Sequence, residues 1–496
     1  MRPYVTFCLL VFPLAAAAAG DALTIYSSAQ PGAIRPEQYR DGGGGAVPGY
    51  AVVRHLRDLE LVLGQNTVRF SDVAALIDPT TVAFESLTDP NGTRVLEQNF
   101  QFDLVNPQKL LEKYIDRTIS VDQVRGSGVE TFRGTLLSTA GGYVLRREDG
   151  SVQLLSTSAG VRLPELPGGL ITRPTLVWDI VAARGGKQKT RVSYQTGGIT
   201  WWADYNLAYS EGANANACKL DVGAWVSILN RSGAGYDDAK LKLVAGDVHR
   251  AAPPGYAAGA LGVPMMARQD MVRGFEEKAF FEYHLYTLGR PTTLPDRSTK
   301  QIELFPVARG VPCEKKLVYY GLAPGWRGFG PNPITDRNVG VPSTRKIDVY
   351  LAFQNSKRNN MGMPLPAGRV RVSKLDDADG TLEFIGEDTI DHTPRDERVL
   401  IKLGSAFDVV GERRQLAFTV DSSRRTMSEQ IEVRLRNHKD QPVTVDVKEN
   451  LYRWVNWKIS RTTDAYRKED ARTVVFPLRV AAGGEQVLRY TVEYSW

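Results

Sequence analysis

The stretch "IEVRLRNHKDQPVTVDV", residues 431–447, decides the fold. In its first half Ile431, Val433 and Leu435 point to one side of an extended chain, and the charged residues between them point to the other. A polar turn follows, and the valines at 443, 445 and 447 repeat the alternation. One buried face and one solvated face are typical of antiparallel strands in a sandwich. The stretch therefore predicts two strands of an antiparallel β-sandwich.

The same pattern recurs along the chain and extends this prediction to an all-β fold class. The stretches "AWVSILN" (224–230) and "DVYLAFQN" (348–355) also read as strands that end at asparagine and lead into a turn. Asp149-Gly150 and Asp379-Gly380 predict hairpins, because Asp-Gly tolerates the positive φ angles of tight turns. We expect antiparallel immunoglobulin-like sandwich domains plus a small β-barrel-like module, with very few short helices.

The clearest helix signal is "NPQKLLEKYI", residues 106–115. Asn106 is a suitable N-cap, and Pro107 suits the first helical position because its missing N–H is not needed there. The helix should span no more than two or three turns.

Composition divides the chain into five segments. The stretch "LPELPGGLITRP" (163–174) reads as a linker, because its prolines cannot donate to a strand ladder. The expected segments are a signal peptide (1–19), an N-terminal β domain (20–107), a small barrel-like β module (108–162), a β-sandwich domain with a mobile loop at 251–278 (163–345) and a C-terminal immunoglobulin-like β-sandwich region (346–496).

The first residues have the three parts of a secretory signal. Arg2 precedes the apolar run "VTFCLLVFPL", and "AAAAAG" offers small-residue cleavage positions around Ala19. No later stretch approaches 18 uninterrupted apolar residues, so we expect no transmembrane segment. The sequence predicts a protein that is exported to the periplasm or secreted.

The charge and the cysteine content of the sequence restrict the classes of partner and cofactor that we expect. The 496 residues include 62 basic and 56 acidic ones, for a formal net charge of +6. Because the two signs are mixed along the chain, we expect no nucleic-acid partner. A solvated surface is the simplest interpretation, with attraction to an acidic glycan or lipid as the alternative. No CxxC pair or Cys/His cluster occurs, so we expect no metal site and no cofactor.

Several long stretches resemble a known family. They are "YHLYTLGRPTTLPDRSTKQIELF", "MPLPAGRVRV", "DHTPRDERVLIKLGSAFDVVGERRQ" and "VRLRNHKDQPVTVDVKENL". Together they are similar to domain of unknown function 4139, an uncharacterised bacterial envelope family that includes mucoidy-inhibitor-A-like proteins. The resemblance covers roughly residues 108–496 and implies an exported β-rich protein, without established catalytic residues. Residues 108–160 lack the coiled-coil heptads of those proteins, which argues against transferring a mucoidy role.

The best binding candidate lies in "GGITWWADYNLAY" (197–209). Alternation puts Trp202 on the polar side of its strand, together with Asp204 and Asn206. An indole among small hydrogen-bonding side chains can stack on a sugar while its neighbours bond the hydroxyls. The alternative is that Trp202 packs beneath another segment, as aromatic side chains most often do. Trp326, in "PGWRGFGPNP", is a second ligand-stacking candidate.

Glu282 and His284, in "FFEYHLY", are the alternative acid/base candidates. A carboxylate beside an imidazole could prepare a general base, but no nucleophile or oxyanion donor stands nearby in the sequence. We interpret them as one face of a sheet. The HExxH, GxSxG and phosphate-loop patterns are all absent, so no residue is predicted to be catalytic.

The function that follows is a non-catalytic binding or structural role in the cell envelope, with an envelope glycan or another envelope protein as partner. The alternative is an enzyme that acts on envelope polysaccharide through paired carboxylates, which leave no spacing signature in a sequence.

Two cysteines, Cys218 and Cys313, remain after removal of the signal peptide. In an oxidising compartment they either pair or stay apart as buried thiols. We favour buried thiols, because pairing requires Cα atoms within roughly 7 Å, which the sequence does not guarantee.

Overall fold

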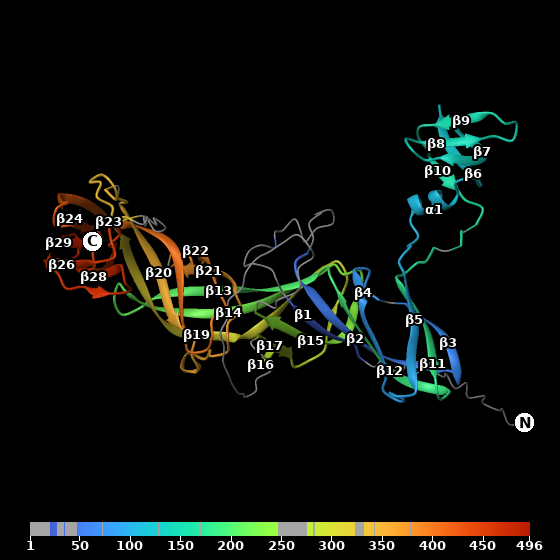
Figure 1. Ribbon diagram of the computed structural model, residues 1–496, viewed down its shortest axis with the longest axis horizontal. Helices are drawn as coiled ribbons and strands as arrows, with labels where there is room; N and C mark the ends of the chain where they lie inside the picture. Colours follow the sequence, from blue (N-terminus) through green and yellow to red (C-terminus); the bar gives the residue numbers. More distant parts are fainter. Residues whose placement is uncertain are drawn as a thin grey trace, which may run out of the picture.

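A computed structural model describes residues 20–26, 34, 47–71, 73–126, 128–165, 167–168, 170–246, 275–280, 283–322, 332–341, 343–376 and 378–496. The described residues form an all-β molecule of elongated shape, with the C-terminal strands at one end (Figure 1). Four predictions concern other residues: the signal peptide (1–19), Glu282, Trp326 and most of the loop 251–278 lie outside the described part.

Two sheets form the N-terminal sandwich. Their strands are β1 (Ala22–Tyr26), β2 (Tyr50–Leu61), β3 (Gly64–Ser71), β4 (Ile77–Ser86), β5 (Thr93–Gln101), β11 (Thr175–Ala182), β12 (Gly186–Thr196), β15 (Tyr236–Ala245), β16 (Phe275–Phe280), β17 (Tyr283–Leu288) and β18 (Thr292–Leu294). One sheet has the order β16-β17-β15-β1-β2-β12-β4, with β18 beside β15, and the other has the order β3-β11-β5. Trp178 of β11 is fully buried, and its ring lies 5.5 Å from that of Phe84 in the opposite sheet.

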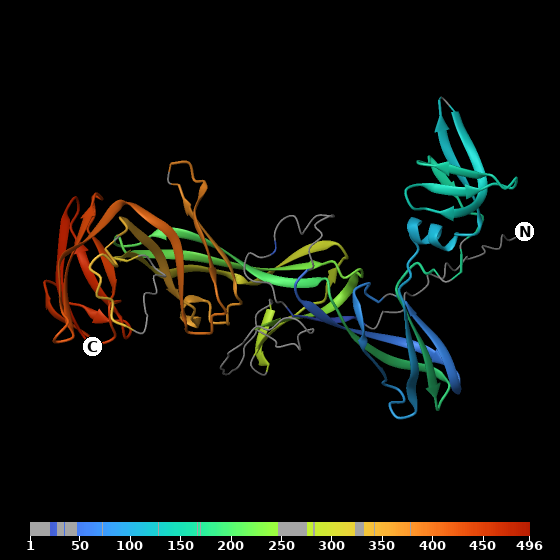
Figure 2. The same cartoon turned by 45° about the horizontal axis from the view of Figure 1, so that its top comes forward.

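The small module is inserted between β5 and β11. It contains α1 (Pro107–Lys113), β6 (Thr118–Arg125), β7 (Gly128–Ser138), β8 (Tyr143–Arg146), β9 (Val152–Leu155) and β10 (Gly160–Arg162). Its sheet has the open order β10-β6-β7-β8-β9, so the module is not a closed barrel. It has a hydrophobic core of its own, which includes Val121 and Leu136. Figure 2 shows the module standing away from the rest of the molecule.

The remaining strands share one large sheet. They are β13 (Ile199–Glu211), β14 (Ala217–Asn230), β19 (Ser298–Tyr320), β20 (Lys346–Gln354), β21 (Gly368–Leu375), β22 (Leu382–Ile390), β23 (Arg398–Asp421), β24 (Thr426–Asn437), β25 (Val443–Asn450), β26 (Trp457–Thr462), β27 (Arg467–Lys468), β28 (Thr473–Val480) and β29 (Glu485–Ser495). The main order is β22-β21-β13-β14-β19-β20-β23-β24-β29-β26. β25 pairs with both β19 and β28, and β27 pairs with β28.

Two unusually long strands join the central and C-terminal parts. β19 has 23 residues and pairs with β14 from Ser298 to Glu314 and with β20 and β25 near its end. β23 has 24 residues and passes from β20 to β24 in the same manner. Strand pairing therefore crosses the expected boundary at residue 345, and β11 and β12 similarly cross the boundary at 163 to complete the N-terminal sandwich.

The local predictions agree with the structure. Ile431, Val433 and Leu435 of β24 are buried together with the valines at 443, 445 and 447 of β25 in one core. Gly150 and Gly380 have φ angles of 85° and 75° in their hairpin turns, which a residue without a Cβ adopts at low cost. The Asn106 side chain caps α1 by accepting a hydrogen bond of 2.9 Å from the Lys109 N–H.

No helix in the described part is long and apolar enough to cross a membrane.

Candidate functional site

Trp202, the predicted stacking residue, is not available to a ligand. Its side chain is 7% exposed and packs in a small cluster with Ile34, Val47 and Leu229. Its indole N–H donates a hydrogen bond of 2.7 Å to Asp204 Oδ2. The packing alternative therefore holds for Trp202, because Ile34, Val47 and Leu229 pack against its side chain.

Asp204 and Asn206 differ in their surroundings. Asp204 is buried and accepts a second hydrogen bond from Ser227 of β14, while the guanidinium groups of Arg369 and Arg371 on β21 lie 3.7 and 3.5 Å from its carboxylate. Asp204 is thus fixed in a polar network on the outer side of the sheet. Asn206, two residues further along β13, is exposed.

The sequence analysis missed Trp225, which is the exposed indole on this side of the sheet. Trp225 lies opposite Asp204 in the β13–β14 register and opposite Glu303 in the β14–β19 register. Its side chain is 39% exposed. The alternation of "AWVSILN" could have found it, since Ala224, Val226 and Ile228 occupy the buried face and leave the tryptophan on the other.

We call Trp225, Asn206, Glu303 and Arg371 the Trp225 platform. Asn206 and Glu303 are exposed, and Arg371 donates a hydrogen bond of 3.0 Å to Glu387 on β22. The four residues come from the four neighbouring strands β21, β13, β14 and β19, so the platform lies on one face of the large sheet. It presents one aromatic face surrounded by hydrogen-bonding groups of both kinds.

His284 does not lie in the continuous strand that the sequence suggested. β16 ends at Phe280 and β17 begins at Tyr283, so the stretch "FFEYHLY" contains a hairpin connection. His284 Nδ1 lies 2.7 Å from Glu277 Oε1 on the neighbouring strand β16. The partner of the imidazole is therefore Glu277, and Tyr286 on the same strand is fully buried.

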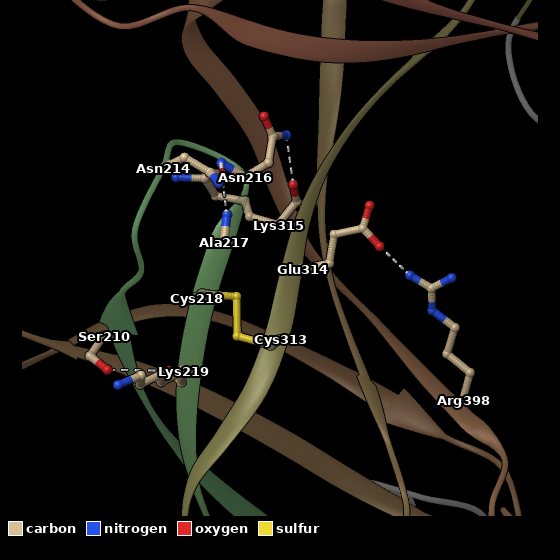
Figure 3. The surroundings of a disulfide bond; sticks show 10 residues. All are labelled: Ser210, Asn214, Asn216, Ala217, Cys218, Lys219, Cys313, Glu314, Lys315 and Arg398. Atoms are coloured by element: carbon tan, nitrogen blue, oxygen red, sulfur yellow. Dashed lines mark hydrogen bonds and ion pairs between the residues drawn. A yellow bond between two sulfur atoms is a disulfide. The ribbon is translucent and has the colours of Figure 1, made fainter.

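Cys218 and Cys313 form a disulfide bond, so the expectation of two separate buried thiols was wrong. They face each other directly in the β14–β19 register, with Cα atoms 4.9 Å apart (Figure 3). β19 also pairs with β20 at Cys313, so the bond lies inside the large sheet and not at its edge. Near the bond Asn216 donates to Lys315 O at 2.9 Å, and Glu314 pairs with Arg398 (Figure 3).

Parts of β19, β20 and β23 enclose a second hydrophobic core together with β24, β25, β28 and β29, and we call this part the C-terminal sandwich. A second surface feature lies where β19 enters it. Two hollows of about 430 and 190 Å³ lie on the two sides of Lys316, whose Nζ is 3.8 Å from both Glu314 Oε2 and Asp446 Oδ2. The larger hollow is also lined by Asn214, Asn216 and Arg479, and the smaller one by Tyr320 and Tyr350. Burial raises the pKa of both tyrosines, so their hydroxyls stay neutral. We call the two hollows together the Lys316 groove.

The most deeply buried charges belong to the C-terminal core. Arg413 and Glu449 are 3.0 Å apart with side-chain exposures of 1% and 0%, and Arg453 and Glu429 form a second buried pair. Both arginines also donate to carbonyl groups of residues 334–340. Because no substrate can reach them, these carboxylates are structural.

Within the described ranges no group of three or more His, Cys, Asp or Glu side chains could hold a metal ion.

No family model matches this sequence, and no curated protein and no solved structure is significantly similar to it. The resemblance to the mucoidy-inhibitor-A-like family therefore stays a prediction that depends on the stretches quoted above.

Proposed function

We propose that this chain is an exported, non-catalytic cell-envelope protein of the mucoidy-inhibitor-A-like family and that it binds an envelope glycan through the Trp225 platform. The observation that carries the proposal is the exposed Trp225 among polar side chains of neighbouring strands. A flat indole can cover the apolar C–H groups of a sugar, and the neighbouring amide, carboxylate and guanidinium groups can bond its hydroxyls. Arg371 and Glu387 hold each other in place, so the platform is ordered before the ligand arrives.

The test is binding of purified envelope glycans to the mature protein. Trp225→Ala should weaken binding at least tenfold without a change in melting temperature, since the side chain is partly exposed and adds little to the core. Phe407→Ala is the matched control, because Phe407 is an exposed aromatic residue on β23, outside the platform. Unchanged binding by Trp225→Ala, or equal loss in both variants, would contradict the proposal.

Export rests on the tripartite segment before Gly20. β1 begins only two residues later and lies between β2 and β15, which fits a mature chain that starts near Gly20. Mass spectrometry of the natively expressed protein should find this start outside the cytoplasm. An intact Met1 in the cytoplasmic fraction would overturn this part of the proposal.

The enzymatic alternative has its best support in the Lys316 groove. Oxygen atoms of Glu314 and Asp446 each lie 3.8 Å from the Lys316 ammonium, so they are less than twice that distance apart. Glycosidases use carboxylate separations of about 5–10 Å. Release of reducing ends from envelope polysaccharide by the native protein, lost in Glu314→Gln and in Asp446→Asn, would favour this function over binding alone.

A further inference from the structure

The Lys316 groove has more basic than acidic side chains along its length. The basic ones are Lys316, Arg398, Lys448, Arg467 and Arg479. The acidic ones are Glu314, Asp446 and Glu469. The surplus is local, because the whole chain is nearly balanced in charge. A groove with this surplus attracts anions.

Two of the basic side chains, those of Lys316 and Arg479, can donate hydrogen bonds to a ligand. Lys316 Nζ lies 3.8 Å from each of its two carboxylate neighbours, which is beyond hydrogen-bonding distance. Arg479 is exposed on β28 and forms no ion pair with any residue that the structure describes. Both side chains line the larger hollow together with the amide groups of Asn214 and Asn216. The hollow can therefore donate several hydrogen bonds to one negatively charged group.

The groove also has surfaces against which a sugar ring can pack. Tyr320 and Tyr350 lie side by side in the smaller hollow, with their hydroxyl oxygens 3.4 Å apart, and Leu400 of β23 lines the same hollow. Leu400 is 51% exposed. Aromatic and apolar surface beside cations is the combination that an acidic sugar requires, because its ring is partly apolar and its carboxylate is charged.

The groove and the Trp225 platform lie on the same side of β19. Cys218 and Cys313 both pack against the core, so Glu314 and Lys316, which alternate with Cys313, point outward. Glu303, the platform residue of β19, lies opposite the outward-facing Trp225. At about 3.3 Å per residue, the stretch from Glu303 to Lys316 spans roughly 40 Å. A single extended polymer can contact both places.

We infer that the ligand of this protein is an extended acidic polysaccharide that lies along the outer side of β19, with a sugar ring stacked on Trp225 and carboxylates bound in the Lys316 groove. This inference rests on the proposed function and names its ligand class. Contacts at two separated places on one chain raise the affinity for long polymers far above that for short ones.

The experiment compares three probes: polygalacturonate, a short galacturonate oligomer and polyglutamate. The native protein should bind polygalacturonate at least tenfold more tightly than the oligomer, and the affinity should fall as salt rises. Arg479→Gln, and the double variant Arg479→Gln/Lys316→Gln, should lose this length advantage and much of the salt dependence. Arg133→Gln, on the small module, is the matched control for loss of one exposed positive charge.

The outcomes separate this inference from the proposed function. If Trp225→Ala loses binding while the groove variants bind polygalacturonate like the native protein, the groove is not part of the site and only the inference fails. Equal binding of polyglutamate would also overturn the inference, since the groove would then recognise charge alone. If the native protein binds neutral but not acidic glycans, the ligand class is wrong. If Trp225→Ala binds normally, the proposed function itself fails.

Arg479→Gln alone keeps the test valid should the double variant fold poorly, because Arg479 has no ion-pair partner in the described structure.

Discussion

Asn230 and Asn437 hold the same position in two different sandwiches: each is the last residue of its strand, and each is about 1% exposed. The Asn230 amide donates to the carbonyl groups of Ala234 and Pro295. The Asn437 amide donates to those of Gln441 and Ala481. In both cases the side-chain oxygen accepts from a backbone N–H two residues ahead. Asn355 after β20 is also buried, but its side-chain oxygen accepts from the Gly362 N–H seven residues ahead, so among these three asparagines the same turn recurs only at Asn230 and Asn437.

Asn437→Ala should destabilise the C-terminal sandwich. The substitution removes the hydrogen bonds to the carbonyl groups of Gln441 and Ala481 and from the Lys439 N–H, although the Ala481 carbonyl still accepts from the Gly484 N–H. Each buried polar group that loses its hydrogen bond costs about 1–3 kcal/mol, so we expect a loss of that order or more in the free energy of unfolding. Chemical denaturation measures it. Asn206→Ala, an exposed asparagine on β13, is the matched control and should change little; equal effects in both would contradict the interpretation.

Local features of the fold could be predicted from the sequence, whereas its long-range contacts could not. Asp149-Gly150, Asp379-Gly380 and the Asn106 cap are determined by residues within a few positions of one another. The continuity of β19 across two sandwiches depends on pairing between distant strands, for which a single sequence has no signal. For the same reason alternation placed Trp202 on the polar side of its strand, but could not show that Ile34 and Val47 pack against it.

Removal of the disulfide should lower stability. The bond joins residues that are 95 positions apart, so it restricts the unfolded chain strongly. On the chain-entropy model a loop of this length gives about 4–5 kcal/mol, and measured values are typically 2–4 kcal/mol. We expect Cys218→Ala/Cys313→Ala to unfold at a clearly lower denaturant concentration than the native protein. Thiol alkylation without reductant should label neither cysteine, even in the unfolded protein; two labels on unfolding would mean that the pair is not bonded.

Asp21 should make the N-terminal sandwich sensitive to acid. Burial by itself would raise the pKa of Asp21, but hydrogen bonds and charges from His55 and Arg57, at 2.9 and 2.8 Å, hold it below its ordinary value. Because the folded pKa lies below the unfolded value of about 3.9, the stabilisation is fully present above that pH and is lost as the pH falls through the folded pKa.

The measurement is the unfolding free energy of native protein and Asp21→Asn as a function of pH. Asp21→Asn should be less stable at neutral pH, and the difference should shrink as the pH falls from about 4 through the lower folded pKa, where the carboxyl of the folded protein also becomes neutral. Asp58→Asn, at an exposed position of the same strand as His55, should differ little from the native protein at any pH. A difference between native protein and Asp21→Asn that does not depend on pH would contradict the assignment.

Arg413 and Glu449 should be strongly coupled in stability. Their pair is fully buried, and Tyr490 and the carbonyl of Gly340 complete its hydrogen bonds. Burial alone would lower the pKa of Arg413, but the adjacent Glu449 carboxylate raises it well above its ordinary value, so removal of either partner leaves an uncompensated charge in the core.

Each single substitution, Arg413→Met or Glu449→Leu, should cost about 3–5 kcal/mol. The double variant should be more stable than the sum of the two losses predicts, because it buries no charge. Removal of the neighbouring pair Arg414–Glu412, in which the arginine is exposed, should cost much less. Additive losses at Arg413 and Glu449, measured by a double-mutant cycle in denaturant, would show that the two side chains contribute independently and would contradict the prediction.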